Sequence, residues 1–310
     1  MKEILDLLII GAGPGGVTAA VYASRTWMNF KIIDKLGVGG QIVKAEAIDN
    51  YPGFPKISGI DLALTFNEHL KELGVELEYE EADKIEEVKE NEDKYFVIHT
   101  KSNKEYYARK VIIATGVVPR KLGIPNEEFF TGKGISYCAT CDGFFYKDKT
   151  IAIVGSGKVA VSSAIYLSQI AKKVYIINRS ENFYDDVKDV SIIKNTENIE
   201  IKYNSEIEEL IGKERLESIL IKNNLSENEK EKINVDGLFV LIGNLPNSEF
   251  VKDKIEVCRK NEIYTDKDFE TTVDGIYAIG DVRQKYVRQI VTAMSDAAIL
   301  IENLQKNKKN

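Results

Sequence analysis

The chain twice repeats one order of apolar and polar positions. Residues 7–10 form a short apolar run, a glycine-rich turn follows at 11–16, and residues 17–27 have helical character before a second apolar run at 30–33. The same order returns over residues 150–177. Short continuous apolar runs are typical of strands that are buried on both faces of a parallel sheet. The pattern predicts an α/β protein with two nucleotide-binding, Rossmann-like domains of the three-layer ββα kind.

The first glycine-rich turn has the spacing of a dinucleotide site. Gly11, Gly13 and Gly16 fit the pattern G-x-G-x-x-G between a strand and a helix. In such turns the first glycine permits the tight bend, the second lets the backbone approach a pyrophosphate, and the third lets the helix pack on the strand. Asp34 ends the next apolar run, where an acid binds a ribose hydroxyl. A tight turn of another α/β protein is the alternative, but the flanking strands and helix favour a nucleotide.

The last part of the chain returns to the first domain. An apolar run at 276–279 and an amphipathic helix at 289–304 close the sequence. We therefore expect the second domain to be inserted in the first. The expected limits are 1–117 and 246–310 for the first domain and 118–245 for the inserted one.

Size and composition narrow the class of protein. A length of 310 residues fits two domains, and a net charge of −7 argues against a nucleic-acid partner held through its phosphates. No apolar run approaches the ~18 residues that cross a membrane, and the N-terminus does not resemble a signal peptide. There are three cysteines, few enough to suggest a reducing compartment. We expect a soluble cytoplasmic protein with no membrane partner.

Two of the cysteines form a redox-type motif. Cys138 and Cys141 are three positions apart, and Asp142 follows directly. That spacing lets two sulfurs cycle between a dithiol and a disulfide. A zinc half-site, a static disulfide and a chance pairing are the alternatives, but no second pair of metal ligands has the needed spacing and a cytosol disfavours static disulfides. We expect redox catalysis, no metal, and a structural role for Cys258.

At these motifs the chain resembles the low-molecular-weight thioredoxin reductase family of flavoproteins over nearly its whole length. The motifs that carry the resemblance follow the family's order: 11–16, 39–41, 50–53, 114–116, 138–143, 280–282 and 288–289. The resemblance implies FAD in the first domain, thioredoxin as the substrate, and a homodimer. It assigns Cys141 to face the flavin, Cys138 to attack the substrate disulfide, and Asp142 to supply or take the proton.

The resemblance also assigns the residues that hold FAD. They come from the first glycine turn, the end of the second strand, two following loops and two later segments. They are Gly11, Gly13, Pro14, Gly16, Asp34, Lys35, Gly40, Gln41, Asn50, Ala114, Thr115, Gly116, Gly280, Asp281, Arg288, Gln289 and Ile290.

The second glycine turn departs from the family where NADPH would bind. The family has His-Arg-Arg after the second strand and another arginine beyond it, whereas this chain has Asn178, Arg179, Ser180 and then Tyr184. Each hydrogen bond to a charged group contributes roughly 1.5–3 kcal/mol, so the loss of two would weaken NADPH about 10²–10⁴-fold. NADH would require an acid where Asn178 stands. The sequence therefore argues against a nicotinamide donor.

Ferredoxin is the donor that the sequence favours. The chain also resembles a ferredoxin-dependent subgroup of flavin thioredoxin reductases, which keeps the FAD site and the dithiol but not the nucleotide-binding residues. Plant-type ferredoxins lie near about −400 mV and thioredoxin near about −270 mV, so the transfer of two electrons is downhill by roughly 6 kcal/mol. An NADPH-dependent reductase and a non-catalytic flavin redox sensor are the alternatives.

Overall fold

The chain folds as two compact units, each built on a mainly parallel sheet. The computed structural model describes residues 2–307, with gaps at 91–92, 185–186, 227–228 and 259. The predicted α/β class is confirmed. Unit 1 comprises Met1–Ala45, Tyr51–Val118 and Leu245–Asn310, and unit 2 comprises Glu46–Asn50 and Pro119–Asn244.

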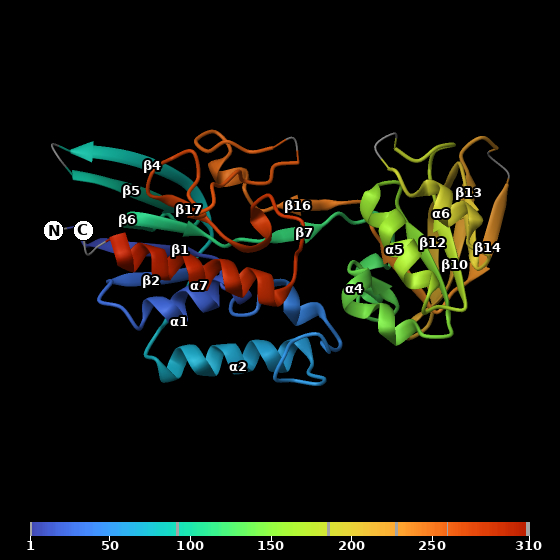
Figure 1. The fold of residues 1–310 in the computed structure, drawn as a ribbon, viewed down its shortest axis with the longest axis horizontal. Coiled ribbons are helices and arrows are strands. Elements are labelled where there is room, and N and C mark those ends of the chain that lie inside the picture. The colour runs from blue at the N-terminus through green and yellow to red at the C-terminus, as the bar shows by residue number, and fades with distance from the viewer. Residues whose placement is uncertain (1, 91–92, 185–186, 227–228, 259, 308–310) are drawn as a thin grey trace. The chain divides into compact units, whose positions relative to one another are not determined.

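A seven-stranded sheet forms the centre of unit 1 (Figure 1). Its order is β3-β2-β1-β6-β5-β4, and β17 pairs with the part of β6 that lies beyond β5. All neighbours are parallel except in the β4–β5–β6 meander. The strands are β1 (Ile4–Ile10), β2 (Phe30–Asp34), β3 (Leu77–Tyr79), β4 (Ala82–Glu90), β5 (Asp93–Thr100), β6 (Glu105–Ile113) and β17 (Ile276–Ala278).

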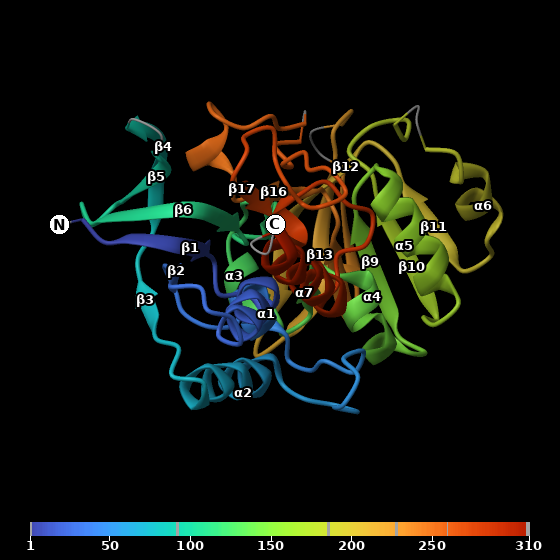
Figure 2. The same ribbon diagram turned by 60° about the vertical axis from the view of Figure 1, so that its left-hand side comes forward.

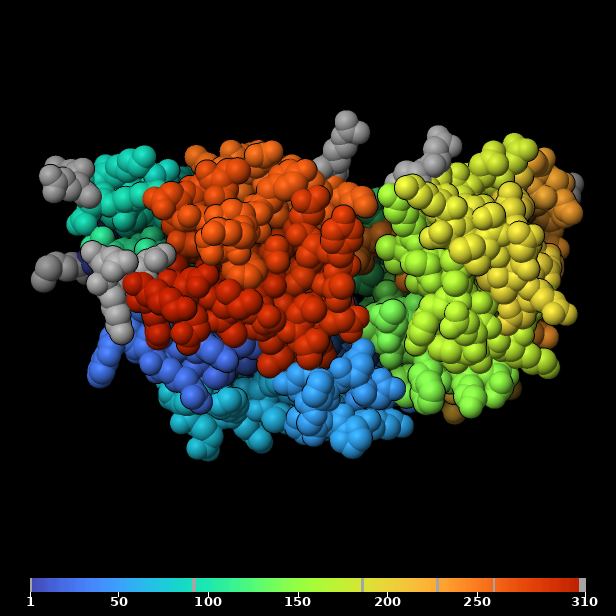
Figure 3. All heavy atoms as spheres, viewed as in Figure 1, coloured from blue at the N-terminus to red at the C-terminus, as the bar shows by residue number. Residues whose placement is uncertain are grey.

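Two helices from opposite ends of the chain pack side by side in unit 1 (Figures 1 and 2). These are α1 (Pro14–Ala23) and α7 (Ile290–Asn307), and α2 (Gly59–Glu72) packs beside α1. Pro14 occupies the first turn of α1, where its fixed φ suits a helix start and no N–H is needed. In the space-filling view, residues 249–307 cover much of the visible face of unit 1 (Figure 3). The described residues of the unit also form the 3₁₀ turns η1 (Gly40–Lys44), η3 (Glu249–Val251) and η4 (Gly280–Val282).

The apolar runs of the sequence become the central strands of both sheets. Residues 7–10 of β1 and 111–113 of β6 are buried, as are 151–154 of β9 in unit 2. These strands lie between neighbours with packed layers on both faces, which is why they read as continuous apolar runs. The edge strand β4 instead has Ile85 buried among exposed charged residues.

Unit 2 contains a five-stranded parallel sheet of order β11-β10-β9-β15-β8 and a three-stranded antiparallel sheet β12-β13-β14. The strands are β8 (Ile135–Ser136), β9 (Thr150–Val154), β10 (Lys173–Ile177), β11 (Ile199–Lys202), β12 (Ser205–Gly212), β13 (Leu216–Asn223), β14 (Lys230–Asn234) and β15 (Gly237–Val240). The helical segments are α3 (Glu127–Phe130), α4 (Ala139–Asp142), η2 (Gly143–Tyr146), α5 (Lys158–Ser168) and α6 (Val190–Asn195).

The two connecting segments pair with each other. β7 (Val117–Pro119) and β16 (Asn244–Pro246) form a two-stranded ribbon at the limits of the units. The segment 46–50 belongs to unit 2 with residues 119–244. Among the described helices, none combines the length and the apolar character that spanning a bilayer requires.

Candidate active site

The first glycine turn of unit 1 leaves space where a ligand could approach. A Cβ at Gly11, whose φ is +110°, would lie 2.4 Å from the carbonyl oxygen of Ala114, and one at Gly16 would lie 1.8 Å from the carbonyl oxygen of Gly11. These two glycines therefore permit the close packing of the turn, the helix and β6. A Cβ at Gly13 would meet nothing within 4 Å. Gly13 thus faces open space at the N-terminus of α1, where backbone N–H groups favour an anion.

Asp34 organises the turn that follows β2. One carboxylate oxygen accepts the N–H of Ala12 at 2.8 Å, and the other accepts the N–H groups of Leu36 and Gly37 at 2.7 and 3.0 Å. A carboxylate has about four lone-pair sites, so capacity remains for a ligand hydroxyl. Asp34 thus joins the glycine turn to the next loop and still presents an acceptor.

A cavity of about 340 Å³ opens beside Asp34. The expected residues Gly11, Asp34, Lys35 and Thr115 line it. Its other walls carry no recognisable motif, because they come from separate segments of the chain. Those walls include Glu80, Glu81, Ala82, Asp83, Lys101, Pro246, Asn247, Glu249 and Phe250.

Thr115 and Gly116 are held by a residue that the sequence did not indicate. Asn247 donates its side-chain N–H to the carbonyl oxygen of Thr115 at 2.8 Å, and the Thr115 hydroxyl donates to the carbonyl oxygen of Asn247 at 2.7 Å. Gly116 has a φ of +64°. Gly40 approaches the first turn closely, since a Cβ there would lie 3.1 Å from the Cα of Gly13.

Asp281 is a partly buried residue whose buried Oδ1 has no hydrogen-bond partner among the described residues. Burial raises its pKa, while the nearby Arg288 and Lys285 oppose that shift. A buried carboxylate oxygen without a partner is costly, so a ligand donor at this position would relieve it. The preceding residue, Gly280, donates its N–H to Asp296 at 3.0 Å, and Asp296 also accepts from the side chain of Lys285 at 2.7 Å.

The last expected residues lie at the start of α7. Arg288 donates to Glu262 at 2.6 Å and, more weakly, to the carbonyl oxygen of Asp281 at 3.4 Å. Gln289 directly precedes α7, and Ile290 is its first residue. Unit 1 thus contains every expected FAD residue except Asn50, which belongs to unit 2.

Cys138 and Cys141 form a disulfide in unit 2, with a Cα–Cα distance of 5.3 Å. Cys138 lies just beyond the carboxyl end of β8 and is the N-cap of the short helix α4, which contains Cys141 and Asp142. The Asp142 N–H donates to the carbonyl oxygen of Cys138 at 3.1 Å. The third cysteine, Cys258, is a free thiol in unit 1 near Glu262.

The environment of Asp142 favours the protonated form of its carboxyl. Burial raises the pKa of its carboxyl, and the negative charges of Asp49 and Glu46 act in the same direction. The Ser136 hydroxyl donates to its Oδ2 at 2.5 Å and opposes the shift. Tyr146, whose pKa is raised to about 12, mainly by burial, lies on the following turn η2. An acid with a raised pKa next to a thiol pair is suited to proton transfer.

The second glycine turn is occupied by protein groups. Asn178 is fully buried at the end of β10, and its Oδ1 accepts from the Ser156 hydroxyl at 2.6 Å. The ring of Tyr184 covers Gly157: a Cβ at Gly157 would lie 3.7 Å from it. Gly157 is the position at which the backbone of such turns approaches a pyrophosphate. Arg179 is exposed.

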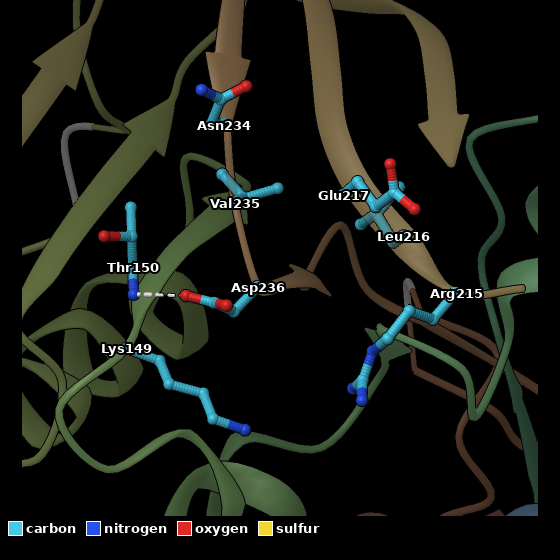
Figure 4. Close-up of a pocket in the computed structure, with 8 residues that line it drawn as sticks. All are labelled: Lys149, Thr150, Arg215, Leu216, Glu217, Asn234, Val235 and Asp236. Carbon is cyan, nitrogen blue, oxygen red and sulfur yellow. Dashed lines mark hydrogen bonds between the residues drawn. The ribbon is translucent and has the colours of Figure 1, made fainter. Parts of the chain in front are cut away.

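Unit 2 has a further hollow of about 360 Å³ (Figure 4). Lys149 and Arg215 point into it, opposite Asp236, which accepts the N–H of Thr150 at 2.9 Å. Thr150 starts β9, whereas Cys138 follows the end of β8, which runs in the same direction. The hollow therefore lies at the amino edge of the sheet, whereas open α/β sheets bind ligands at the carboxyl edge.

A family model for pyridine nucleotide-disulphide oxidoreductases matches residues 5–297. The chain belongs to the pyridine nucleotide-disulphide oxidoreductase family. Thioredoxin reductase of Mycoplasma genitalium is 39% identical over 301 residues, which cover 97% of this chain and 94% of that protein. The Bacillus subtilis thioredoxin reductase is 37% identical over 309 residues, covering 98% and 95%.

Solved structures of family members agree with this assignment. Thioredoxin reductase from Streptococcus pyogenes matches with a TM-score of 0.91 and 36% identity, covering 100% of this chain and 99% of that one. A ferredoxin-flavin thioredoxin reductase from Clostridium acetobutylicum matches with a TM-score of 0.53 and 30% identity, covering 100% of both chains. The protein is a flavin disulfide oxidoreductase of the thioredoxin reductase type, and its cofactor is FAD.

The residues of unit 1 fit that cofactor. Gly13 leaves room for a pyrophosphate at the N-terminus of α1, Asp34 retains acceptor capacity for a ribose, and Asp281 presents a buried oxygen for a further hydroxyl. These three features lie on separate segments of one unit, as a long dinucleotide requires.

Proposed function

We propose that this enzyme reduces the disulfide of thioredoxin through Cys138 and Cys141. The observation that carries the proposal is the Cys138–Cys141 disulfide with the partly buried carboxyl of Asp142 beside it. The relatives named thioredoxin reductase support thioredoxin as the substrate. Phe144, two positions beyond Asp142, is 63% exposed and offers an apolar contact to a protein substrate.

FAD is proposed to be held by the domain formed from residues 1–117 and 246–310. When bound, FAD supplies the electron pair that opens the disulfide in the inserted domain, 118–245. The first turn is shaped by Gly11, Gly16 and Gly40. Hydrogen bonds from FAD would be accepted by Asp34 and Asp281. Arg288 carries positive charge beside Asp281. The remaining assigned contacts are Gly13, Pro14, Lys35, Gln41, Ala114, Thr115, Gly116, Gly280, Gln289 and Ile290. Asn50 is also proposed as an FAD contact, from the segment 46–50 that belongs to unit 2.

The chain's own groups then perform thiol–disulfide exchange. The Cys138 thiolate forms a bond to one substrate sulfur as the substrate disulfide breaks and the other substrate sulfur leaves. The Cys141 thiolate then bonds Cys138 and releases the substrate sulfur that was joined to it. Asp142 gives a proton to a departing thiolate. Its raised pKa makes the protonated form more available than in an ordinary aspartate.

We propose reduced ferredoxin as the electron donor. Three features of unit 2 weigh against NADPH: the Tyr184 ring over Gly157, the Asn178 amide bound to Ser156, and Arg179 as the one retained arginine of the family's clasp. An NADPH-dependent reductase is the second candidate, which the similarity to ordinary thioredoxin reductases favours.

Anaerobic mixing distinguishes the two donors. Reduced ferredoxin should bleach the visible flavin absorbance and support multiple turnovers of thioredoxin reduction, whereas NADPH should do neither at rates near turnover. Fast bleaching by NADPH would contradict the ferredoxin proposal. The Cys138→Ser variant is the control, because it should bleach with ferredoxin, keep its FAD and reduce no thioredoxin. The absence of thioredoxin turnover in the wild type with both donors would favour a redox sensor.

We also propose that two copies of the chain assemble. Trp27 is fully exposed, and Ile60 and Leu64 on α2 are 61% and 54% exposed. Large apolar side chains in solvent are typical of interaction surfaces. Sedimentation of the wild type and the Trp27→Ser variant tests this: the wild type should be a dimer and the variant should dissociate more readily.

A further inference from the structure

We infer that Ser136 is a positioning residue for the dithiol chemistry, because its hydroxyl joins the carboxyl of Asp142 to the main chain of Cys138. The inference rests on the function proposed for that site. Ser136 ends β8, lies opposite Phe239 of β15, and is only 6% exposed. A short strand within the parallel sheet therefore fixes its position.

Three contacts converge on the Ser136 hydroxyl. It donates to Asp142 Oδ2 at 2.5 Å, and it receives the N–H of Cys138 at 3.1 Å. The carbonyl oxygen of Cys138 lies 3.3 Å away as a second acceptor. The serine thus touches both the proposed acid and the backbone of the attacking cysteine.

This arrangement satisfies Asp142 in both protonation states. A hydroxyl has one donor and two lone pairs, and the Cys138 N–H uses one lone pair. When Asp142 is ionised, the Ser136 hydrogen goes to Oδ2. When Asp142 is protonated, its O–H donates to the free lone pair of Ser136, and the serine hydrogen turns to the Cys138 carbonyl. The carboxyl can therefore lose and regain a proton without moving away from the sulfurs.

The charged surroundings of Asp142 make that contact important. Glu46 and Asp49 face it from the segment 46–50, and Tyr146 faces it from η2. Burial and the two carboxylates raise the pKa of Asp142, whereas the Ser136 hydrogen bond lowers it. Removal of the hydroxyl should therefore raise the pKa of Asp142 further.

The reaction at this site is balanced without an external oxidant. The two enzyme thiols lose protons and become joined by a sulfur–sulfur bond, while the substrate disulfide breaks and its two sulfurs gain protons. A departing alkyl thiolate needs a proton from Asp142. A departing aromatic thiolate leaves readily without one, because the rate rises as the pKa of the leaving thiol falls.

The test uses FAD-loaded enzyme that has been reduced by dithiothreitol and desalted. Single-turnover reduction of hydroxyethyl disulfide and of dithiobis(nitrobenzoate) is measured against pH. We expect Ser136→Ala to slow the alkyl reaction about tenfold, the effect of losing a charge-assisted hydrogen bond. The alkaline limb of the pH–rate profile of this variant should move to higher pH, because Asp142 keeps its proton up to a higher pH. The aromatic reaction should stay within about twofold of the wild type, as expected when no protein proton is needed.

Matched variants separate positioning from general damage. Ser136→Thr keeps a hydroxyl and should retain the wild-type pH profile. Ser205→Ala removes another buried hydroxyl of unit 2, which bonds the carbonyl oxygen of Tyr203, and should change neither reaction. In an Asp142→Asn background, Ser136→Ala should add no further loss, since the two groups act as one unit.

An unchanged alkaline limb in Ser136→Ala, or equal losses with both disulfides, would overturn the inference. An additive loss of rate in the double variant Ser136→Ala/Asp142→Asn would also overturn it. If the alanine variant does not fold, a shifted alkaline limb in the pH–rate profile of Ser136→Thr would overturn it instead. If Cys138→Ser and Asp142→Asn both leave the alkyl reaction intact, the proposed function itself fails. If those two variants are impaired but Ser136→Ala reacts like the wild type, only the proposed role of Ser136 is refuted.

Discussion

At the scale of single residues, the chemistry of this protein depends on two partly buried carboxyls, one in each unit. Burial raises the pKa of both Asp142 and Asp281. Asp142 has a serine partner and lies beside a disulfide, which suits it to proton transfer. Asp281 has an oxygen with no partner among the described residues, which suits it to a ligand hydroxyl. The same physical cause thus supports two different roles.

Asp142 should make stability depend on pH. Its folded-state pKa is raised, so its stabilising contribution is fully present below the unfolded pKa and is lost as pH rises through the folded value. At pH 8 the Asp142→Asn variant should therefore melt roughly 2–4 °C above the wild type, and the gap should close near about pH 4. Thermal unfolding followed by circular dichroism measures this. The exposed Asp148→Asn is the control, and a variant no more stable at pH 8 would refute the prediction.

At the scale of elements, each glycine of the first turn has a different physical task. Gly16 brings α1 against the turn, and Gly13 opens the helix N-terminus to a ligand. The carboxyl end of β17 continues into η4, and Asp296 on α7 fixes that turn through the N–H of Gly280. Helix starts and strand ends therefore define the cofactor site.

Gly13 and Gly16 should respond differently to alanine. Gly13→Ala has room for its methyl group, so the variant should fold normally but bind FAD at least about tenfold more weakly, the effect of ~1.4 kcal/mol. Gly16→Ala would place its Cβ 1.8 Å from the carbonyl oxygen of Gly11, so its unfolding temperature should fall. FAD titration of apoprotein and thermal unfolding measure both effects. Gly157→Ala in unit 2 should leave FAD affinity unchanged.

Asp296 should matter for the stability of unit 1. It pairs with the side chains of Lys285 and Arg283 at 2.7 and 3.1 Å and is only 7% exposed. Asp296→Ala leaves two cations and the Gly280 N–H without their acceptor, which should cost about 3–5 kcal/mol. Urea unfolding provides the measurement, with the exposed Glu302→Ala on the same helix as the control. A loss below about 1 kcal/mol would show that water replaces the pair.

At the scale of the whole molecule, the chain divides its chemistry between two units. The cofactor features lie in unit 1 and the disulfide in unit 2, and the paired segments β7 and β16 lead from one to the other. Because these two short strands pair, the ends of the inserted part are close together, as in domains that fold independently.

The inserted part should therefore fold alone. A fragment of residues 117–246 should unfold cooperatively, bind no FAD, and retain a reducible Cys138–Cys141 disulfide. Thermal unfolding, visible absorbance and thiol titration before and after reduction are the measurements. A fragment without a cooperative transition would mean that the inserted part depends on the rest of the chain, including the segment 46–50.

The sequence by itself determined the apolar strands, the glycine turns and the spacing of the two thiols. These features depend on residues close together along the chain, so local periodicity and backbone freedom are enough to predict them. The absence of the family's other arginines around Arg179 could be read from the sequence for the same reason.

Only the tertiary structure decided which distant groups meet. It joined Ser136 to Asp142, placed Tyr184 over Gly157, left Asp281 without a partner for one oxygen, and moved the segment 46–50 to unit 2. These outcomes depend on how helices and strands pack, and on which buried polar atoms find hydrogen-bond partners. No linear pattern contains that information, because a residue's partners are chosen in space.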